Sequence, residues 1–155
     1  KLKQMNRDIK ISSDFIVGYP NETEKDFKDT IEIIKKIDFI NSYSFIFSSR
    51  PGTAASNLKS VDINIAKKRL SLIQSQLFNN QSLKNKMAEN TILNVLVENK
   101  IKKQNKFFGR TEYMTSVIFD GGKNIEGKVV PVLITSSNQN NLFGEISYKK
   151  NIKAA

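Results

Sequence analysis

The spacing of apolar positions changes twice along the chain and divides it into three segments. The first opens with alternating apolar residues in 9–17 and then breaks at residues 18–21, which is typical of a buried parallel strand that ends in a loop. A helix is predicted next, because Thr23 and Asp26 have the spacing of a capping box. Its apolar positions recur at steps of four, three and three, and they are Phe27, Ile31, Ile34 and Ile37.

Residues 43–47 predict a second strand, because they are mostly aromatic or β-branched and end at a turn-forming stretch. A strand, a helix and a parallel strand bury only one face of their sheet. We therefore expect residues 1–60 to be part of a larger α/β fold, with further elements before Lys1.

The second segment, residues 62–87, predicts one long amphipathic helix. Its apolar stripe consists of Ile63, Ala66, Leu70, Ile73 and Leu77. Opposite the stripe the sequence places Lys67, Lys68 and Arg69. These cations form either an ordinary solvated face or a basic surface for RNA.

In the third segment the period shortens to that of strands. Five short strand-like runs are separated by polar stretches, and together they predict a small closed or nearly closed antiparallel barrel of the oligonucleotide-binding kind. The runs are Thr91–Glu98, Phe107–Thr111, Ser116–Phe119, Lys128–Thr135 and Leu142–Tyr148. Such barrels often bind nucleic acid, although a purely structural or protein-binding barrel has the same pattern.

The composition limits the chemistry that the chain can perform. Its 155 residues include 25 Lys and Arg against 15 Asp and Glu, a formal charge of +10, with neither Cys nor His. Thiolate nucleophiles, cysteine-bound clusters and histidine proton transfer are therefore excluded within these residues. The basic excess is densest at residues 61–86 and reflects either A/T-rich coding or a surface for a phosphate backbone. No apolar run approaches the length of a membrane span or signal sequence, which predicts a soluble, cytoplasmic protein.

Two loops at the ends of the predicted strands form the candidate ligand site. Carboxyl ends of adjacent parallel strands face the same site, so residues 18–23 and 48–53 should lie together. Gly18 would allow a flat ligand to approach the backbone closely, and Arg50 offers a planar fork to a carboxylate or phosphate. The glycines at 121–122 are interpreted instead as a hairpin turn.

These loops resemble one known family. The sequence ISSDFIVGYPNET at residues 11–23 and SSRPGTAA at residues 48–55 are similar to the radical S-adenosylmethionine methylthiotransferases, in particular to members that form 2-methylthio-N6-isopentenyladenosine in tRNA. Arg69-Leu70, Gly109-Arg110-Thr111 and NLFGE at residues 141–145 resemble the family's C-terminal TRAM domain, a small RNA-binding barrel. The resemblance covers nearly the whole chain.

The resemblance implies an α+β fold in two parts. Residues 1–60 would be the last strands and helix of a partial, TIM-like α/β radical enzyme barrel, 61–87 the connecting helix, 88–149 the five-stranded antiparallel TRAM barrel, and 150–155 a tail. The rim of the S-adenosylmethionine pocket would include Asp14, Ile16, Gly18, Pro20, Glu22, Ser48 and Arg50.

The resemblance also implies tRNA as the partner, bound at its anticodon stem-loop, with no DNA or membrane and with the protein a monomer. The candidate RNA contacts are Lys106, Phe108, Arg110 and Tyr113 on the barrel, and Lys68 and Arg69 on the helix. Phe107 is the alternative to Phe108 as a stacking surface.

The whole enzyme would use S-adenosylmethionine and two [4Fe–4S] clusters to attach a methylthio group to C2 of the isopentenylated adenosine. The family's Cys-x-x-x-Cys-x-x-Cys is absent, so this chain is interpreted as the C-terminal third and is expected to be inactive alone. Asn21 replaces a common Gly, and the turn should survive because Asn tolerates positive φ. The alternatives are a sister enzyme acting on a ribosomal protein aspartate or on threonylcarbamoyl adenosine, and a stand-alone RNA-binding module.

Overall fold

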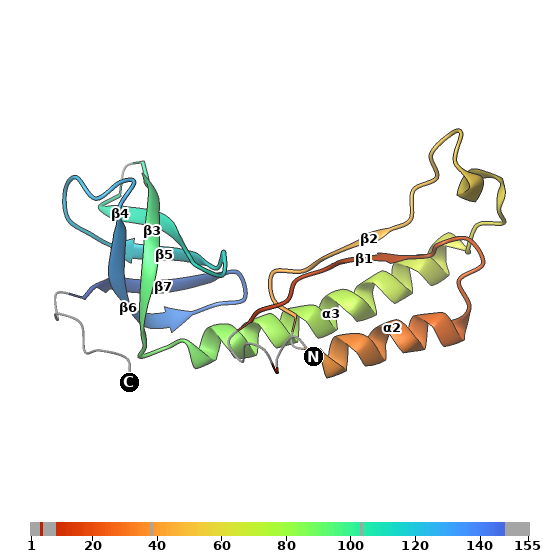
Figure 1. Ribbon diagram of the computed structural model, residues 1–155, viewed down its shortest axis with the longest axis horizontal. Helices are drawn as coiled ribbons and strands as arrows, with labels where there is room; N and C mark the ends of the chain where they lie inside the picture. The colour runs from red at the N-terminus through yellow and green to blue at the C-terminus, as the bar shows by residue number, and fades with distance from the viewer. Residues whose placement is uncertain (1–3, 5–8, 38, 103, 148–155) are drawn as a thin grey trace. The chain divides into compact units, whose positions relative to one another are not determined.

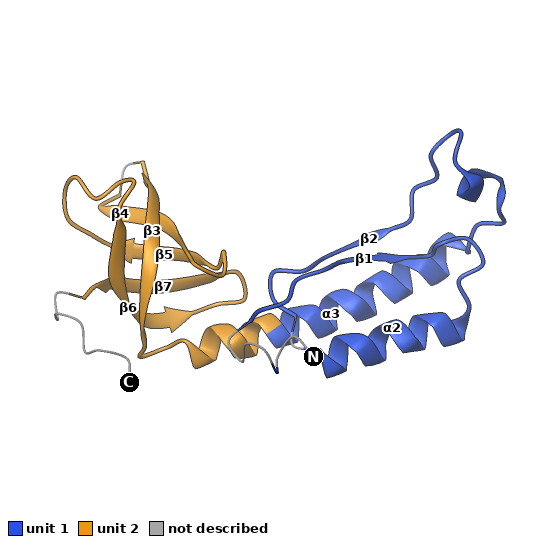
Figure 2. Cartoon of the chain, in the orientation of Figure 1, with its two compact units in different colours: residues 1–80 blue, residues 81–155 orange. Residues whose placement is uncertain are grey.

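The computed structural model describes residues 4, 9–37, 39–102 and 104–147. The predicted tail at 150–155 and Tyr148, the last residue of the fifth predicted strand, lie outside the described residues. The chain forms two compact units, residues 1–80 and 81–155, shown in blue and orange (Figure 2). The elements are β1 (Asp14–Val17), α2 (Glu24–Lys36), β2 (Tyr43–Ile46), the 3-10 helix η1 (Ala54–Asn57), α3 (Ile63–Met87), β3 (Ile92–Lys100), β4 (Lys106–Thr111), β5 (Ser116–Asp120), β6 (Val129–Ser137) and β7 (Asn141–Ile146) (Figure 1).

The sheet of the first unit consists of β1 and β2. The two strands are parallel, with Asp14 opposite Tyr43, which confirms the predicted strand–helix–strand order. The first strand is shorter than the predicted range 9–17, and before it an isolated parallel bridge joins Ile11 to Phe39.

Helix α2 begins where the sequence predicts. Thr23 Oγ1 accepts the backbone N–H of Asp26, and the Asp26 carboxylate accepts the backbone N–H of Thr23, so the capping box is complete. Its apolar stripe packs with residues of α3 against one face of the sheet, on the side where Figure 1 shows both helices. The buried residues of this core are Phe15, Val17, Phe27, Ile34, Phe39, Ile73 and Leu77.

The other face of the sheet is exposed and, apart from Asp14, apolar. Ile16, Tyr43 and Phe45 are 56%, 65% and 52% exposed. The expectation that a strand–helix–strand unit covers only one face of its sheet is confirmed within the described residues.

Helix α3 corrects two placements made from the sequence. Ile63 was assigned to the buried stripe but is 52% exposed, because it is the first helical residue and packing begins one turn later at Ala66. Arg69 was assigned to the exposed face but is only 6% exposed. Its burial follows from two carboxylates near the start of α2 that approach this turn of α3.

The second unit contains a closed barrel in the order β3-β4-β5-β7-β6. Five strands form close to their predicted positions, but the prediction of a wholly antiparallel barrel was wrong, because β5 and β7 are parallel. The cause is the connection at residues 121–128. It carries the chain to β6, which pairs with β3 and β7 and not with β5. For the same reason the interpretation of residues 121–122 as a hairpin turn was wrong.

Strand alternation supplies the barrel core. The inward residues are Val95, Val97, Phe107, Val117, Phe119, Val132, Ile134 and Leu142. At the inward positions Gly109 and Gly144, a Cβ atom would collide with the carbonyl oxygens of Leu96 and Leu133, respectively. Both glycines therefore allow neighbouring strands to close the barrel. No helix in the described part of the chain is long and apolar enough to cross a membrane.

Candidate functional site

The carboxyl ends of β1 and β2 border a cleft of about 570 Å³. The structure brings three predicted pocket residues, Ile16, Ser48 and Arg50, to this cleft. Arg50 stands in a turn closed by Thr53, whose Oγ1 donates to the Arg50 carbonyl oxygen at 2.8 Å. The two strand-end loops therefore share one site, as their positions after parallel strands predict.

Three aromatic residues of the cleft were not among the predicted site residues: Tyr19, Phe45 and Phe47. The rings of Tyr19 and Phe47 meet edge to face, with centroids 4.9 Å apart. Phe45 and Phe47 could have been found from the alternation along residues 43–47, because it places every second side chain on the face away from the helices. Tyr19 had no such signal, because its position depends on the turn that follows β1.

The other four predicted pocket residues do not line the cleft. Asp14 is exposed at the start of β1, whereas the cleft lies at the strand's end. Gly18 and Pro20 are buried. Gly18 has φ +72°, and a Cβ there would lie 2.9 Å from the Cβ of Ala66. The close approach that Gly18 permits in this structure is to α3.

Glu22, the fourth of these residues, closes a tight turn. Its backbone N–H donates to the Tyr19 carbonyl oxygen at 2.9 Å, with Pro20 and Asn21 between them. Asn21 has φ 65°, which confirms that Asn maintains the positive φ expected where the family commonly has Gly. Pro followed by a residue of positive φ is the sequence of a type II turn. The Glu22 carboxylate also accepts the backbone N–H of Gly18 at 2.8 Å.

Arg69 binds this turn from α3. Its Nη1 lies 2.6 Å from Glu22 Oε2, and its Nη2 lies 3.1 Å from Glu24 Oε2. Burial opposes the charge of Arg69, but the hydrogen bonds to both carboxylates outweigh that penalty and raise its pKa. Because its guanidinium is buried in these contacts, Arg69 does not offer the exposed cation that was predicted for RNA. Lys68, its neighbour, is exposed.

On the barrel, the predicted RNA contacts of β4 lie on the outer surface. Arg110 Cζ stands 5.3 Å from the centroid of the half-buried Phe108 ring, and Arg110 Nε is 3.0 Å from Glu98 Oε1. Lys106 Nζ is 3.9 Å from Asp120 Oδ2. Tyr113 is half-buried in the turn between β4 and β5. Outward alternation places Lys106, Phe108 and Arg110 on one face.

Phe107 points the other way. It is 4% exposed and belongs to the barrel core, so the alternative that it forms a stacking surface was wrong. Of the two adjacent phenylalanines, only Phe108 presents part of its ring to solvent.

Comparison with known proteins identifies this barrel. Residues 86–147 match the TRAM domain family. The barrel is a TRAM domain. Over all 155 residues the chain is 61% identical to the tRNA-2-methylthio-N(6)-dimethylallyladenosine synthase of Pelagibacter ubique (strain HTCC1062), of which it covers 35%.

Proteins of the same name from other organisms match nearly as much of the chain. The identity is 48% over 147 residues for Vesicomyosocius okutanii and 39% over 148 residues for Rickettsia typhi, in each case 94% of this chain and 33% of the relative. The chain thus spans about a third of the length of these relatives. The family resemblance seen in the sequence is confirmed.

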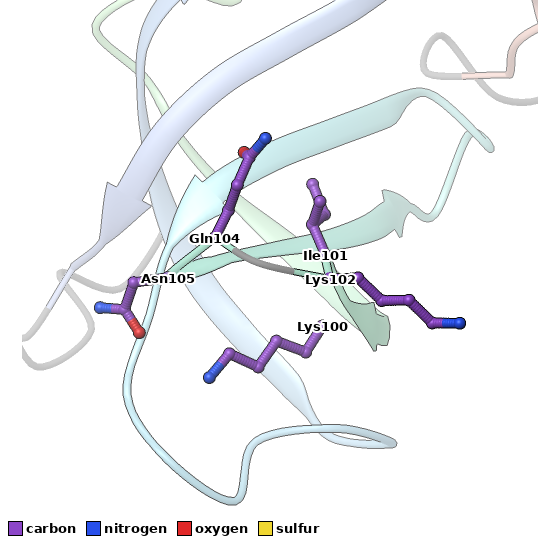
Figure 3. A pocket seen from close by; sticks show the side chains of 5 residues that line it. All are labelled: Lys100, Ile101, Lys102, Gln104 and Asn105. Atoms are coloured by element: carbon purple, nitrogen blue, oxygen red, sulfur yellow. The ribbon is translucent and has the colours of Figure 1, made fainter.

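The TRAM domain has a second basic feature, which the sequence reasoning did not single out. The loop between β3 and β4 borders a shallow cleft of about 560 Å³, lined by Lys100, Ile101, Lys102, Gln104 and Asn105. In Figure 3 the side chains of Lys100 and Lys102 extend from this loop in different directions. The available signal was the polar, lysine-containing stretch between the two predicted strands. Among the described residues no cluster of Asp, Glu, Cys and His could hold a metal ion.

Proposed function

We propose that this chain is part of an enzyme that transfers a methylthio group to C2 of N6-isopentenyladenosine beside the tRNA anticodon. The observation that carries the proposal is the 61% identity to a tRNA-2-methylthio-N(6)-dimethylallyladenosine synthase across both compact units. A match confined to the TRAM domain would support RNA binding alone. Similarity through residues 1–80 extends the argument to the catalytic part.

In this proposal the TRAM domain binds the anticodon stem-loop. Lys106 and Arg110 would contact phosphates, and Phe108 and Tyr113 would offer ring surfaces to unpaired bases. Lys68 on α3 would add a phosphate contact. Arg69 is left out of this interface, because its guanidinium is buried between two carboxylates.

The cleft of the first unit would hold S-adenosylmethionine. Its volume of about 570 Å³ suits a small molecule, and its lining combines aromatic walls with one guanidinium. Tyr19 and Phe47 would pack against the adenine, while Arg50 would bind the carboxylate of the methionine part. When bound, S-adenosylmethionine would supply the radical and the methyl group. This chain has no cysteine, so the two [4Fe–4S] clusters do not fit its residues.

The test replaces the 155 aligned residues of the Pelagibacter ubique protein by this chain. The chimera is expressed in bacteria that lack the modification, and tRNA nucleosides are analysed by mass spectrometry. We expect 2-methylthio-N6-isopentenyladenosine to appear. A folded, cluster-loaded chimera that leaves the nucleoside unmodified contradicts the proposal. Methylthiolation of threonylcarbamoyl adenosine or of a ribosomal protein aspartate would instead indicate a sister enzyme.

Arg50→Ala in the chimera tests the cleft, and Lys59→Ala is its matched control. Both changes remove one exposed cation between β2 and α3, but only Arg50 lines the cleft. We expect Arg50→Ala to weaken S-adenosylmethionine binding roughly tenfold, as for the loss of one charge-assisted hydrogen bond. Equal affinity in the two variants would remove Arg50 from the site.

A non-catalytic RNA-binding module is the second candidate. The TRAM domain has its own closed core, and the chain carries no cluster ligands. This candidate predicts that the 155-residue chain binds an anticodon stem-loop with a steep salt dependence, while the chimera stays inactive. Absence of binding at low salt would contradict an RNA role for the barrel.

A further inference from the structure

A buried ion pair connects helix α3 to the turn at the rim of the cleft. We propose that Arg69 is a positioning residue for the ligand of that cleft and acts through Glu22 and Tyr19. The inference rests on the proposed function, because it takes S-adenosylmethionine as the ligand. It assigns to Arg69 a role distinct from the RNA contact predicted from the sequence.

The first step is the contact between Arg69 and Glu22. Their side chains are 8% and 9% exposed, and Nη1 of the arginine reaches both Oε2 of Glu22 at 2.6 Å and its backbone carbonyl oxygen at 3.3 Å. The guanidinium also packs on the ring of Phe27, 5.2 Å from its centroid. A buried guanidinium with two contacts to one residue restricts the orientation of that residue.

The second step is the contact between Glu22 and Gly18. Glu22 Oε2, which accepts a hydrogen bond from Arg69 Nη1, also accepts the Gly18 N–H at 2.8 Å. Gly18 has little room to move, since it lies against Ala66 with a positive φ. One carboxylate oxygen therefore holds the beginning of the turn, while the Glu22 N–H closes its end on the Tyr19 carbonyl oxygen.

Tyr19 connects this turn to the cleft. Tyr19 is the first residue of the closed turn and lines the cleft, with its ring against that of Phe47. Tyr19 remains 48% exposed, so its neighbours alone do not enclose it. The turn sets the backbone position from which this ring projects, and Phe47 contacts one side of the ring.

The ion pair is poorly explained as a device for stability alone. Arg69 Nε is buried and finds no hydrogen-bond partner among the described residues. Buried ion pairs often contribute no more stability than apolar residues of similar volume, and an orphaned donor adds a further penalty. What the pair does provide is a defined orientation of the turn.

The test compares Glu22→Gln with Glu24→Gln in the chimera described above. Each change removes one negative charge that contacts Arg69, but the Glu24 side chain is 65% exposed, and the Gly18 N–H donates to Glu22. The dissociation constant for S-adenosylmethionine is measured by calorimetry on cluster-loaded protein. We expect Glu22→Gln to raise it about tenfold and Glu24→Gln to change it less than about twofold. Arg69→Lys retains the positive charge but loses the planar guanidinium group. Its dissociation constant should lie between those of the other two variants.

Two further measurements separate positioning from general destabilisation. In a Tyr19→Ala background, Glu22→Gln should have no additional effect on the dissociation constant, because the residue through which it acts is gone. In the 155-residue chain, Glu22→Gln should accelerate amide hydrogen exchange at residues 18–22 relative to the unmodified chain. The Ile73 amide of α3 should stay protected.

The outcomes distinguish the inference from the function on which it rests. If the unmodified chimera does not bind S-adenosylmethionine, both are wrong. If it binds and Glu22→Gln behaves like Glu24→Gln, or if the effects of Glu22→Gln and Tyr19→Ala simply add, the proposed function stands and the positioning role of Arg69 is wrong.

Discussion

The side-chain amide of Asn85, near the end of α3, lies 2.8 Å from the carbonyl oxygen of Asn138 in the β6–β7 turn. The same Nδ2 donates to the Gln139 carbonyl oxygen at 3.1 Å, and Asn85 Oδ1 accepts from Gln81. Asn85 is only 3% exposed. A single buried amide thus attaches the last turns of the helix to the TRAM barrel.

We expect Asn85→Ala to destabilise the second unit by about 2 kcal/mol, because it removes a buried side-chain amide and the two hydrogen bonds that this amide donates. Amide hydrogen exchange at Val95 and Val97 in the barrel core measures this loss. Asn79→Ala, an exposed change on the same helix, is the control and should leave the exchange rates nearly unchanged. Equal protection in both variants would show that the Asn85 contacts contribute nothing measurable.

Gly144→Ala should destabilise the barrel by about 2 kcal/mol, because the added methyl group meets the Leu133 carbonyl oxygen and the Val132 side chain. Gly122→Ala provides a matched control, since nothing lies within 4 Å of its added Cβ. Thermal unfolding followed by circular dichroism checks both. A barrel that tolerates the two changes equally would contradict the close strand approach at Gly144.

Phe107 and Phe108 should respond oppositely to truncation. Phe108→Ala should weaken binding of an anticodon stem-loop roughly tenfold, as for loss of one stacking surface, with little change in stability. Phe107→Ala should cost about 3 kcal/mol or more of stability, because its ring fills the barrel core. Fluorescence polarisation gives the affinity and thermal unfolding gives the stability. If Phe108→Ala binds RNA as the unmodified chain does, its ring is not a base platform.

Lys106→Gln should reduce the slope of log affinity against log salt concentration by about one unit, as expected for one lost phosphate contact. Lys25→Gln changes the net charge equally, but Lys25 lies on α2 and outside the barrel, with a side chain that is 83% exposed. The salt slope should therefore be unchanged in Lys25→Gln. Equal slopes in the two variants would indicate a general charge effect.

Acid should weaken the second unit partly through Glu89. Hydrogen bonds from Lys86 and Ser137 lower the pKa of Glu89 below its ordinary value of 4.5. A carboxyl group with a lowered folded-state pKa contributes stability above its unfolded value, and this contribution disappears as the pH falls through the folded value. We expect the melting temperature to fall below about pH 4.5, and to fall less steeply in Glu89→Gln. An unchanged slope in that variant would contradict the role of this carboxylate.

The local sequence pattern was sufficient to predict the main helices and strands of this protein. The capping box at Thr23 and Asp26, the long helix and the five barrel strands depend on neighbours within a few residues, so their periods and turn residues are visible in the chain. The positive φ of Asn21 could also be predicted, because tolerance of positive φ is a property of the residue type itself. Sequence resemblance added the TRAM domain at residues 86–147.

Long-range contacts decided the rest. Arg69 looks like part of a basic helix face, but Glu22, 47 positions earlier, draws its guanidinium into a buried pair. The parallel pairing of β5 with β7 depends on where β6 docks, which no local period specifies. The main helices and strands followed from the sequence, because helix and strand preferences act between near neighbours, whereas the 3-10 helix η1 and the course of residues 121–128 did not. Only the tertiary structure decided which charges are buried and which aromatic rings share a cleft, because both depend on partners that folding brings together.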